Sequence, residues 1–454
     1  MELQIILTYV LAACLNVAAL WRVRLARLTF IDGLILGMTY YVSVPMVAVL
    51  AAGRIGPEFV PISDYRPYVD TTTSYLIIGG IAALSLVRLL IPGQKTMPLR
   101  SQAYSLRYLL RALLLLYFAT TIISFFVSGV ASGGHWFRAS HELMETSPGY
   151  VALKQISNIT RTIVFGALAT VAVRDRSAAR RALVIGATIV LVDLFATFNR
   201  ITIVYFLVLV LVCFRRRALL TCGALGGLLL SGAYVSSGFT EFRGLVGMYG
   251  YSPSGFSQAL DGAVRRMTEE EKPFVDQMNG VFESINITVF NYVVQYRGQL
   301  GVSTSDVIVR PLTTVIPRAA LPSRPPPFAS VLGKAITGSD AAALNSTLWG
   351  EFYAGAAVPG LLIWLLFLPP LHLLYVCLAR ANPAYGPIGA LVAFAWWRFD
   401  TSFLMNAGIF AVLIHFLLLL SVRAGRDLFG KPRRRLPPPR PPLPAAADLK
   451  GSIL

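Results

Sequence analysis

Eleven apolar stretches alternate with short polar connectors along the chain, and each approaches the length that crosses about 30 Å of hydrocarbon as a helix. We expect these helices at 3–20, 29–52, 73–92, 108–130, 151–173, 182–198, 201–214, 218–237, 354–378, 386–400 and 404–422. The sixth and seventh are short and separated only by Asn199 and Arg200, so a single bent element there is the alternative. The pattern predicts an all-α polytopic membrane protein.

Charge gives these helices an orientation. The net charge is +18, yet only 14% of the residues are charged and the mean hydropathy is +0.65, whereas a soluble domain carries about 25% charged residues. The basic residues gather in alternate connectors, at Arg22/Arg24/Arg27, Lys95/Arg100/Arg107, Arg174/Arg176/Arg180/Arg181 and Arg215/Arg216/Arg217. Basic connectors are typically cytoplasmic. We therefore expect an external N-terminus, a cytoplasmic C-terminus and no nucleic-acid partner.

The connectors divide the chain into four parts. Residues 1–237 form a first bundle of about eight spans, and residues 354–422 form the last three. Between them, 238–353 is a large external loop with short helical stretches such as 274–296, and a segment of this size is more often functional than a mere connector. The tail, 423–454, is rich in Pro and Arg and is expected to be disordered, with attraction to anionic lipids or an SH3-type ligand as its two possible roles.

Motifs for nucleotide or metal chemistry are not found in the sequence. There is no Walker A, dinucleotide-binding, HExxH or G-x-S-x-G pattern, and all four cysteines fall within expected spans. The acidic residues of the first external loop, Glu58, Asp64 and Asp70, are separated rather than paired. We expect neither a cofactor nor a catalytic metal.

Arginine is the conspicuous residue of the external segments. The guanidinium group matches phosphate oxygens and stays charged in a partly dry site, and this side of the membrane is expected to carry Arg200, Arg243, Arg297, Arg310, Arg318 and Arg324. Snorkelling to the membrane interface is the alternative role of Arg200. Arg161 falls inside an expected span, where it is either functional or paired with Asp193 or Asp400.

The densest group of candidate residues lies between 309 and 360. Prolines fix the backbone around Arg318 and Arg324, which limits the entropy lost when these side chains bind a ligand. Glu351 follows just before Gly355 and Gly360, at the mouth of a span. There it is either a general base or an orienter of arginine, or a carboxylate that stabilises the helix N-terminus.

These residues resemble the bacterial O-antigen polymerase family, the oligosaccharide repeat-unit polymerases. That family shows I-P-R, then K/R-P, then G-E-x-Y-x-x-x-G-x-x-G at the start of a late span. Here the matching residues are Ile316-Pro317-Arg318, Arg324-Pro325 and Gly350-Glu351-Phe352-Tyr353, with a looser spacing of Gly355 and Gly360. Asn199-Arg200 is similar to an S-R turn of the same proteins. The resemblance implies a GT-C-like membrane glycosyltransferase in the bacterial inner membrane, with a periplasmic N-terminus.

The implied reaction joins lipid-linked sugars. A hydroxyl of one undecaprenyl-pyrophosphate-linked repeat attacks the anomeric carbon of the growing glycan, which leaves its lipid pyrophosphate. The resemblance gives catalytic roles to Glu351 and Arg318. Substrate binding is expected of Arg200, Arg324, Arg243, Arg297, Lys334 and Tyr353. Weaker candidates are His135 and His141, for the pKa of their imidazole groups, and Arg138 and Arg161.

Beyond the glycan donor and acceptor, the implied partners are membrane lipid, a chain-length regulator and a flippase. Two other functions stay open: an O-antigen ligase that transfers glycan to lipid A core, and a lipid-linked sugar flippase or secondary transporter. Transporters typically show internal repeats, and none is visible here.

Overall fold

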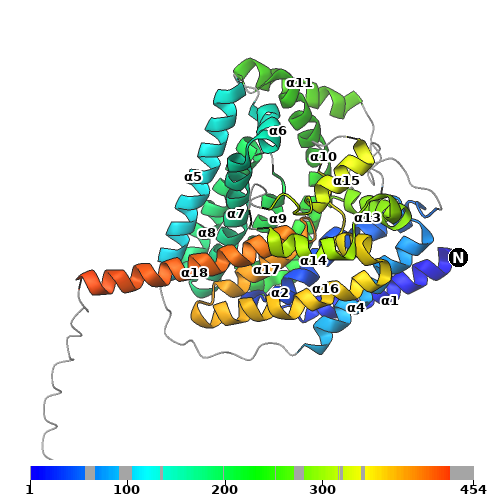
Figure 1. Ribbon diagram of the computed structural model, residues 1–454, viewed down its shortest axis with the longest axis horizontal. Coiled ribbons are helices and arrows are strands. Elements are labelled where there is room, and N and C mark those ends of the chain that lie inside the picture. The colour runs from blue at the N-terminus through cyan, green and yellow to red at the C-terminus, as the bar shows by residue number, and fades with distance from the viewer. Residues whose placement is uncertain are drawn as a thin grey trace, which may run out of the picture.

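The computed structural model describes residues 2–56, 67–91, 105–132, 136–197, 199–250, 252–269, 281–314, 316, 321–338 and 343–429. Within these ranges the chain is almost entirely helical and contains no β-strand (Figure 1). The first half contains α1 (Glu2–Trp21), η1 (Leu25–Arg27), α2 (Phe30–Met38), η2 (Thr39–Ser43), α3 (Val44–Ala51), α4 (Thr71–Leu90), α5 (Leu106–Ser132), α6 (Trp136–Thr146), α7 (Pro148–Arg174), α8 (Arg176–Val192), η4 (Asp193–Thr197) and α9 (Ile201–Cys213). The second half contains η5 (Arg215–Arg217), α10 (Ala218–Tyr249), α11 (Pro253–Glu269), α13 (Ile285–Tyr296), η6 (Arg297–Gln299), α14 (Thr304–Thr313), α15 (Phe328–Thr337), α16 (Leu348–Ala381), α17 (Tyr385–Trp396) and α18 (Thr401–Phe429).

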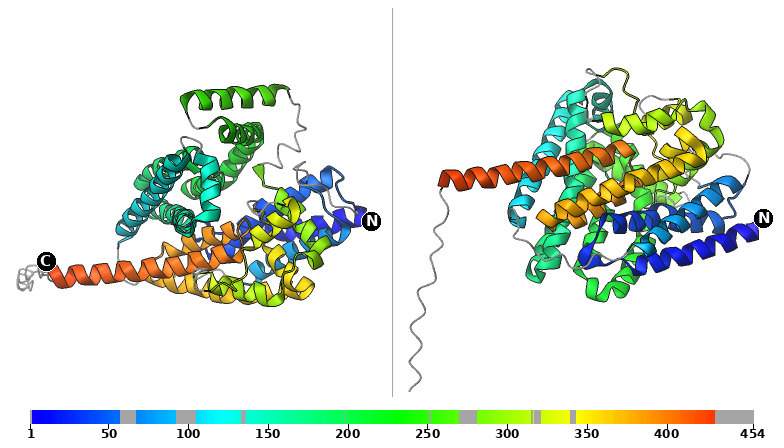
Figure 2. Two further views of the ribbon diagram at one scale, coloured as in Figure 1. Left: turned by 45° about the horizontal axis from the view of Figure 1, so that its top comes forward. Right: turned by 60° about the horizontal axis from the view of Figure 1, so that its bottom comes forward.

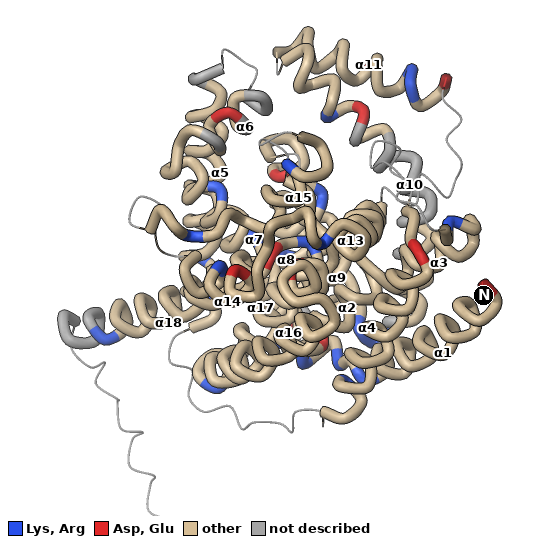
Figure 3. The backbone as a smooth tube through the Cα atoms, turned by 45° about the vertical axis from the view of Figure 1, so that its right-hand side comes forward, with Lys and Arg blue, Asp and Glu red and all other residues tan. Residues whose placement is uncertain are grey.

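Seven helical segments in the described ranges are long and apolar enough to cross a membrane. They are α1, α2 together with α3, α4, α5, α7, α16 and α18. Their outward faces carry large apolar side chains, as on α1 and α18, and Figure 3 shows long stretches of tube without charge. The prediction of an all-α multi-pass membrane protein is confirmed at this level.

The expected sixth and seventh spans are two helices rather than one bent element. Gly186 of α8 packs against Phe206 and Leu209 of α9, so the two helices fold back on each other as a hairpin. A turn with π-helical hydrogen bonding, η4, joins them together with Asn199 and Arg200. The alternative of a single bent element is therefore wrong.

Several helix ends differ from the expected ones. The helix expected to end at 237 continues as α10 to Tyr249, where Phe242, Leu245 and Val246 pack against Ala259 and Ala263 of α11. This contact buries apolar side chains that a free loop would expose, which accounts for the extra turns. Figure 1 shows α11 at the edge of the molecule, away from α2, α16 and α17. The expected helix over 274–296 is α13, which starts at Ile285, and 270–280 lie outside the described residues.

The short helix α17 forms the centre of the core. All but one of its residues are buried, and α2 and α7 pack closely against it. Glycines permit this approach: a Cβ on Gly33 of α2 would overlap the backbone of Ala390, and one on Gly166 of α7 would overlap Ile388. Around this centre, α16 and α18 run side by side, and α18 extends beyond the bundle (Figures 1 and 2).

Several of the basic connectors lie together. Arg88, near the end of α4, donates a hydrogen bond to the carbonyl of Arg22 over 2.7 Å. Arg215 donates to the carbonyl of Val173 over 3.1 Å, and η1 contacts α9. These contacts gather the connectors after α1, α4, α7 and α9 at one end of the bundle, which we call the basic end.

Candidate functional site

Glu351 lies in the first turn of α16 and is only 3% exposed. Both of its carboxylate oxygens have partners. Oε1 accepts a hydrogen bond from Nη1 of Arg310 over 2.8 Å, and Oε2 accepts one from the backbone N–H of Thr401 over 2.9 Å. Glu351 thus joins α16 to α14 and to the start of α18. Because a buried charge needs such partners, the carboxylate is held in one orientation.

Arg310 completes this buried ion pair from α14. Its Nε donates to the carbonyl of Pro326 over 2.6 Å, and its guanidinium group lies over the ring of Phe328 at 5.7 Å from the centroid. Arg310 is 2% exposed. The proline-rich segment after 321 is therefore fastened to the ion pair through a backbone carbonyl.

Asp400 adds a second carboxylate beside Glu351. It lies in the turn between α17 and α18, where Oδ1 accepts a hydrogen bond from the backbone N–H of Phe403 and so caps α18. Burial, reinforced by the negative charge of Glu351, raises the pKa of Asp400 to about 6. A carboxyl group with such a pKa can take up and release a proton near neutral pH.

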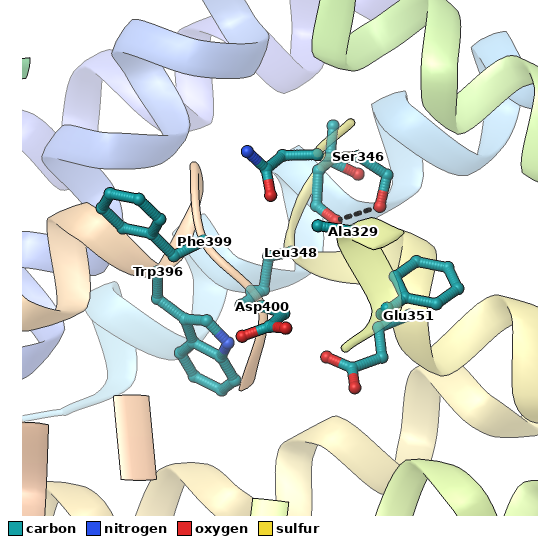
Figure 4. A pocket seen from close by; sticks show the side chains of 10 residues that line it. Ala329, Ser346, Leu348, Glu351, Trp396, Phe399 and Asp400 are labelled. Atoms are coloured by element: carbon teal, nitrogen blue, oxygen red, sulfur yellow. Dashed lines mark hydrogen bonds between the residues drawn. The ribbon is translucent and has the colours of Figure 1, made fainter. Parts of the chain in front are cut away.

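A small pocket lies between the two carboxylates (Figure 4). Its free volume is about 10 Å³, which is about enough for one water molecule. Besides Glu351 and Asp400 it is lined by Phe328, Ala329, Asn345, Ser346, Thr347, Leu348, Trp396 and Phe399. In Figure 4 the carboxylates of Glu351 and Asp400 come from different elements, and Trp396 and Phe399 lie on the side of Asp400. The site combines a fixed ion pair, a titratable carboxyl group and aromatic walls.

A kink in α16 follows its first two turns, which carry Glu351. The backbone leaves helical geometry at Ala356 and Ala357, and Ala357 has φ of +53°. This left-handed conformation is strained for a residue with a Cβ and typically costs about 1–3 kcal/mol. Pro359 lies just beyond and cannot donate the helical hydrogen bond. The kink separates the first two turns of α16, with Glu351, from its long apolar part.

A second group of charged side chains surrounds Arg398, which lies with Asp400 in the turn between α17 and α18. Nε of Arg398 is 2.8 Å from Oε2 of Glu283, and its Nη1 donates to Oδ1 of Asn199 over 3.0 Å. Asn199 also accepts from the backbone N–H of Ile201, the first residue of α9. Arg200 lies close enough to influence Tyr40 electrostatically, together with Arg398 and Glu283. The Asn199–Arg200 turn thus belongs to a group of ionic side chains.

The two helices that lead into this group are shorter than a helix that crosses a membrane usually is. α9 has 13 residues and α17 has 12, so at 1.5 Å per residue they are about 20 and 18 Å long. Both are shorter than the roughly 30 Å of a hydrocarbon core. Arg200 begins α9 and Arg398 follows α17, and their turns are joined by the Arg398–Asn199 hydrogen bond.

Arg161 forms another buried ion pair within the bundle. Its Nη1 is 2.9 Å from Oδ2 of Asp193, the first residue of the η4 turn. Asp193 also accepts hydrogen bonds from the hydroxyls of Tyr117 and Thr202. Of the alternatives raised for Arg161, pairing with Asp193 is the one found, and it stabilises the α8–α9 turn that positions Arg200.

The remaining predicted residues do not surround one open cavity. Arg297 donates to the carbonyls of Ala354 and Gly355, over 3.0 and 3.3 Å, and so secures the backbone before the kink. Arg324 donates to the carbonyls of Thr314 and Ile316, over 3.0 and 2.9 Å. Both arginines stabilise the fold of the segment around Glu351.

Tyr353 is 9% exposed and packs edge-on against Phe290. Lys334 is exposed on α15, and Arg243 is half-buried on α10, away from the pocket. Arg318 and His135 lie outside the described residues, as do the side chains of Arg138 and His141 in α6. Of the predicted residues that the structure describes, Glu351, Arg200 and Arg161 lie beside charged groups, and only Glu351 lines the pocket.

Four residues of these groups were not among the predicted site residues: Arg310, Asp400, Arg398 and Glu283. Arg398 and Asp400 carried a usable signal, because they are two charges within the apolar run WWRFDTSF, where an ionisable residue is a functional hypothesis by default. Glu283 has φ of +50°, which the sequence does not reveal.

Among the described residues, no group of three or more His, Cys, Asp or Glu side chains is placed to hold a metal ion. Comparison with known proteins finds no matching family, no matching curated protein and no matching solved structure. A function for this chain must therefore be argued from the chemistry of the site.

Proposed function

We propose that this protein polymerises undecaprenyl-pyrophosphate-linked oligosaccharide repeat units by metal-independent glycosyl transfer at the outer face of a bacterial inner membrane. The observation that carries the proposal is the pocket in which Asp400, with a pKa raised to about 6, lies beside the buried Arg310–Glu351 pair. Glu351 belongs to the Gly350–Tyr353 motif that resembles the repeat-unit polymerases, and Arg310 and Asp400 lie beside it in space. This arrangement supplies a proton acceptor next to fixed positive charge.

The proposed roles follow from the contacts. Asp400 accepts the proton of the attacking hydroxyl, because its carboxyl group titrates close to working pH. Glu351 orients Arg310, since both of its oxygens are already engaged. Arg200 and Arg398 stabilise the charge that develops on the departing pyrophosphate, a charge larger in the transition state than in the ground state. Arg318 and Arg324 are assigned to the phosphate by the resemblance.

The proposal includes the finer topology. Eleven crossings, with α8, α9, α10 and α17 added to the seven long apolar segments, place the N-terminus in the periplasm and the basic end in the cytoplasm. Under this topology the short helices α9 and α17 start or end below the periplasmic surface. The site is then reached from the periplasm and from the lipid that holds the undecaprenyl chain.

The test is a reconstituted polymerisation assay. Proteoliposomes with the full chain are given lipid-linked repeat units, and products are resolved by length. We expect a ladder of oligomers from the native protein. Asp400→Asn should reduce its formation by at least about 10²-fold, the scale of general base catalysis. Asp261→Asn, a matched loss of an exposed carboxylate on α11, should leave the ladder unchanged. A normal ladder from Asp400→Asn would contradict the assigned role.

Two alternatives give different outcomes in the same system. A ligase would attach one finished glycan to lipid A core and produce no ladder from repeat units alone. A lipid-linked sugar transporter is favoured by the short helices α9 and α17, because broken helices at membrane depth are typical of transporters. It would move repeat units across the bilayer without lengthening them.

A further inference from the structure

A second pocket, unrelated to the site above, lies at the basic end of the bundle. Its volume is about 450 Å³, and it is lined by Ala18, Trp21, Arg22, Arg24, Arg88 and Leu89. These residues come from the end of α1, the connector that follows it, and the end of α4. The volume is within the range of about 300–1,000 Å³ typical of small-molecule sites.

The pocket is built on a buried ion pair. Arg88 is 5% exposed, and its Nε is 2.8 Å from Oδ1 of Asp32 in the first turn of α2. The other oxygen of Asp32 accepts from the backbone N–H and the hydroxyl of Thr29, which forms a capping box. Nη2 of Arg88 donates to the carbonyl of Arg22 over 2.7 Å. Arg88 therefore fixes the connector that carries the other two arginines of the pocket.

Arg22 and Arg24 supply the positive charge that faces the pocket. Both side chains are exposed, and within the described ranges neither guanidinium group has a carboxylate partner. Asp32 balances the charge of Arg88 alone. Two arginines on one fixed connector match the oxygens of a phosphate group by bidentate hydrogen bonds.

An apolar surface leads directly from this pocket along α1. Only 28% of the apolar stretch of α1 is buried inside the bundle, and its outward face carries Leu3, Leu7, Leu11 and Val17, each more than half exposed. Trp21 ends the helix and is 81% exposed, as is typical of a residue at the level of lipid head groups. Acyl chains can lie along α1 while their head group occupies the pocket.

We propose that this pocket binds the phosphate head group of an anionic phospholipid, with Arg22 and Arg24 contacting the phosphate and Arg88 acting as a positioning residue. A free soluble phosphate compound shares the charge but not the acyl chains. The exposed apolar face of α1 favours the lipid. A basic pocket between helices at one side of a membrane is typical of anionic lipid sites.

The experiment measures binding of fluorescent phosphatidylglycerol to the purified, delipidated full-length protein in neutral detergent. The double variant Arg22→Ala/Arg24→Ala should weaken binding by about tenfold or more, since charge-assisted hydrogen bonds to the phosphate are lost. The matched control is Arg216→Ala/Arg217→Ala, which removes two exposed arginines from η5, and it should have little effect. Leu89→Trp, which fills the pocket and keeps every charge, should also weaken binding.

Three outcomes would overturn the proposal. Equal losses in the two double variants would mean that the lipid responds to diffuse charge and not to this pocket. Unchanged binding by Leu89→Trp would place the lipid elsewhere. If inorganic phosphate displaced the fluorescent lipid at the same concentration as unlabelled phosphatidylglycerol does, the pocket would be a site for soluble anions instead. Thermal unfolding of each variant checks that the fold is retained.

Discussion

Asp400 and Glu351 face the same small pocket but have different surroundings. Glu351 is paired with Arg310 and receives a backbone N–H, whereas Asp400 is half-buried and accepts a backbone hydrogen bond at the start of α18. Two titratable groups whose surroundings differ in this way can take different chemical roles. One carboxylate orients an arginine, and the other is available for proton transfer.

This difference predicts a pH profile. If Asp400 is the proton acceptor, it must be ionised to act, and its pKa is raised to about 6. Polymer formation should therefore be full above this pH and fall as the pH drops through about 6. The measurement is the initial rate of ladder formation against pH.

Glu351→Gln provides the control for this assignment. Removing the negative charge of Glu351 removes a cause of the raised pKa of Asp400, so the acid limb of the residual activity should move to lower pH. A limb that stays in place would show that another group titrates.

The Arg310–Glu351 pair also predicts a stability cycle. Glu351→Leu or Arg310→Met alone leaves an unpaired charge in a buried position and should cost about 3–5 kcal/mol. The double variant Glu351→Leu/Arg310→Met should lose clearly less free energy of unfolding than the sum of the two single losses, because neither charge is left unpaired. Thermal unfolding in detergent measures the cycle. The exposed pair Arg265–Glu269 serves as the comparison, because pairs of that kind contribute about 0–1 kcal/mol.

Part of this site could be predicted from sequence and part could not. Glu351 stands out because a carboxylate at the start of an apolar helix is unusual and the flanking residues form a motif. Its partners are 41 and 50 residues away in the chain, and no local pattern fixes pairing over such a separation. Arg297 and Arg324 were predicted to bind phosphate, but in the structure both donate to backbone carbonyls. The sequence could not show this, because these contacts depend on how the 297–355 segment folds.

At the scale of elements, the packing of α17 depends on close helix approach. Gly33→Ala would drive a methyl group into the backbone of Ala390, which cannot move aside as a side-chain end can. We expect a loss of about 1–3 kcal/mol, seen as a lower unfolding temperature.

Gly79→Ala is the matched substitution. Gly79 lies in α4 with no atom within 4 Å of the added Cβ, so this change should be neutral or stabilise by about 0.5–1 kcal/mol. Equal effects of the two substitutions would contradict the described α2–α17 contact.

Helix existence was predictable, whereas several helix ends were not. Apolar stretches predicted all the long helices because a span needs about 20 apolar residues. The η2 and η4 turns, at Thr39–Ser43 and Asp193–Thr197, interrupt such stretches. Pro45, just after η2, is a local signal because it cannot donate the helical hydrogen bond to Tyr41, whereas η4 contains no Pro or Gly. In η4, Asp193 makes buried contacts with Arg161 and Tyr117. These are tertiary contacts between different helices, so no local sequence pattern predicts them.

For the whole molecule, the distribution of carboxylates predicts activity without a divalent metal. Asp70, just before α4, caps that helix by accepting from the backbone N–H of Thr73, and Glu58 and Asp64 lie outside the described residues. Ladder formation should be the same with and without a chelator such as EDTA. Activity that is lost with EDTA and restored by Mg²⁺ or Mn²⁺ would contradict this prediction.

The shortness of α9 and α17 has an electrical consequence. Under the proposed topology, in which α9 and α17 cross the membrane, the turns that carry Arg200 and Arg398 lie part of the way across the hydrocarbon layer. A charge that crosses the full membrane potential changes in energy by about 2.3 kcal/mol per 100 mV. In the proposed reaction, a pyrophosphate that moves between the surface and these arginines would cross a fraction of that potential, so the membrane potential would contribute to how tightly the substrate is bound.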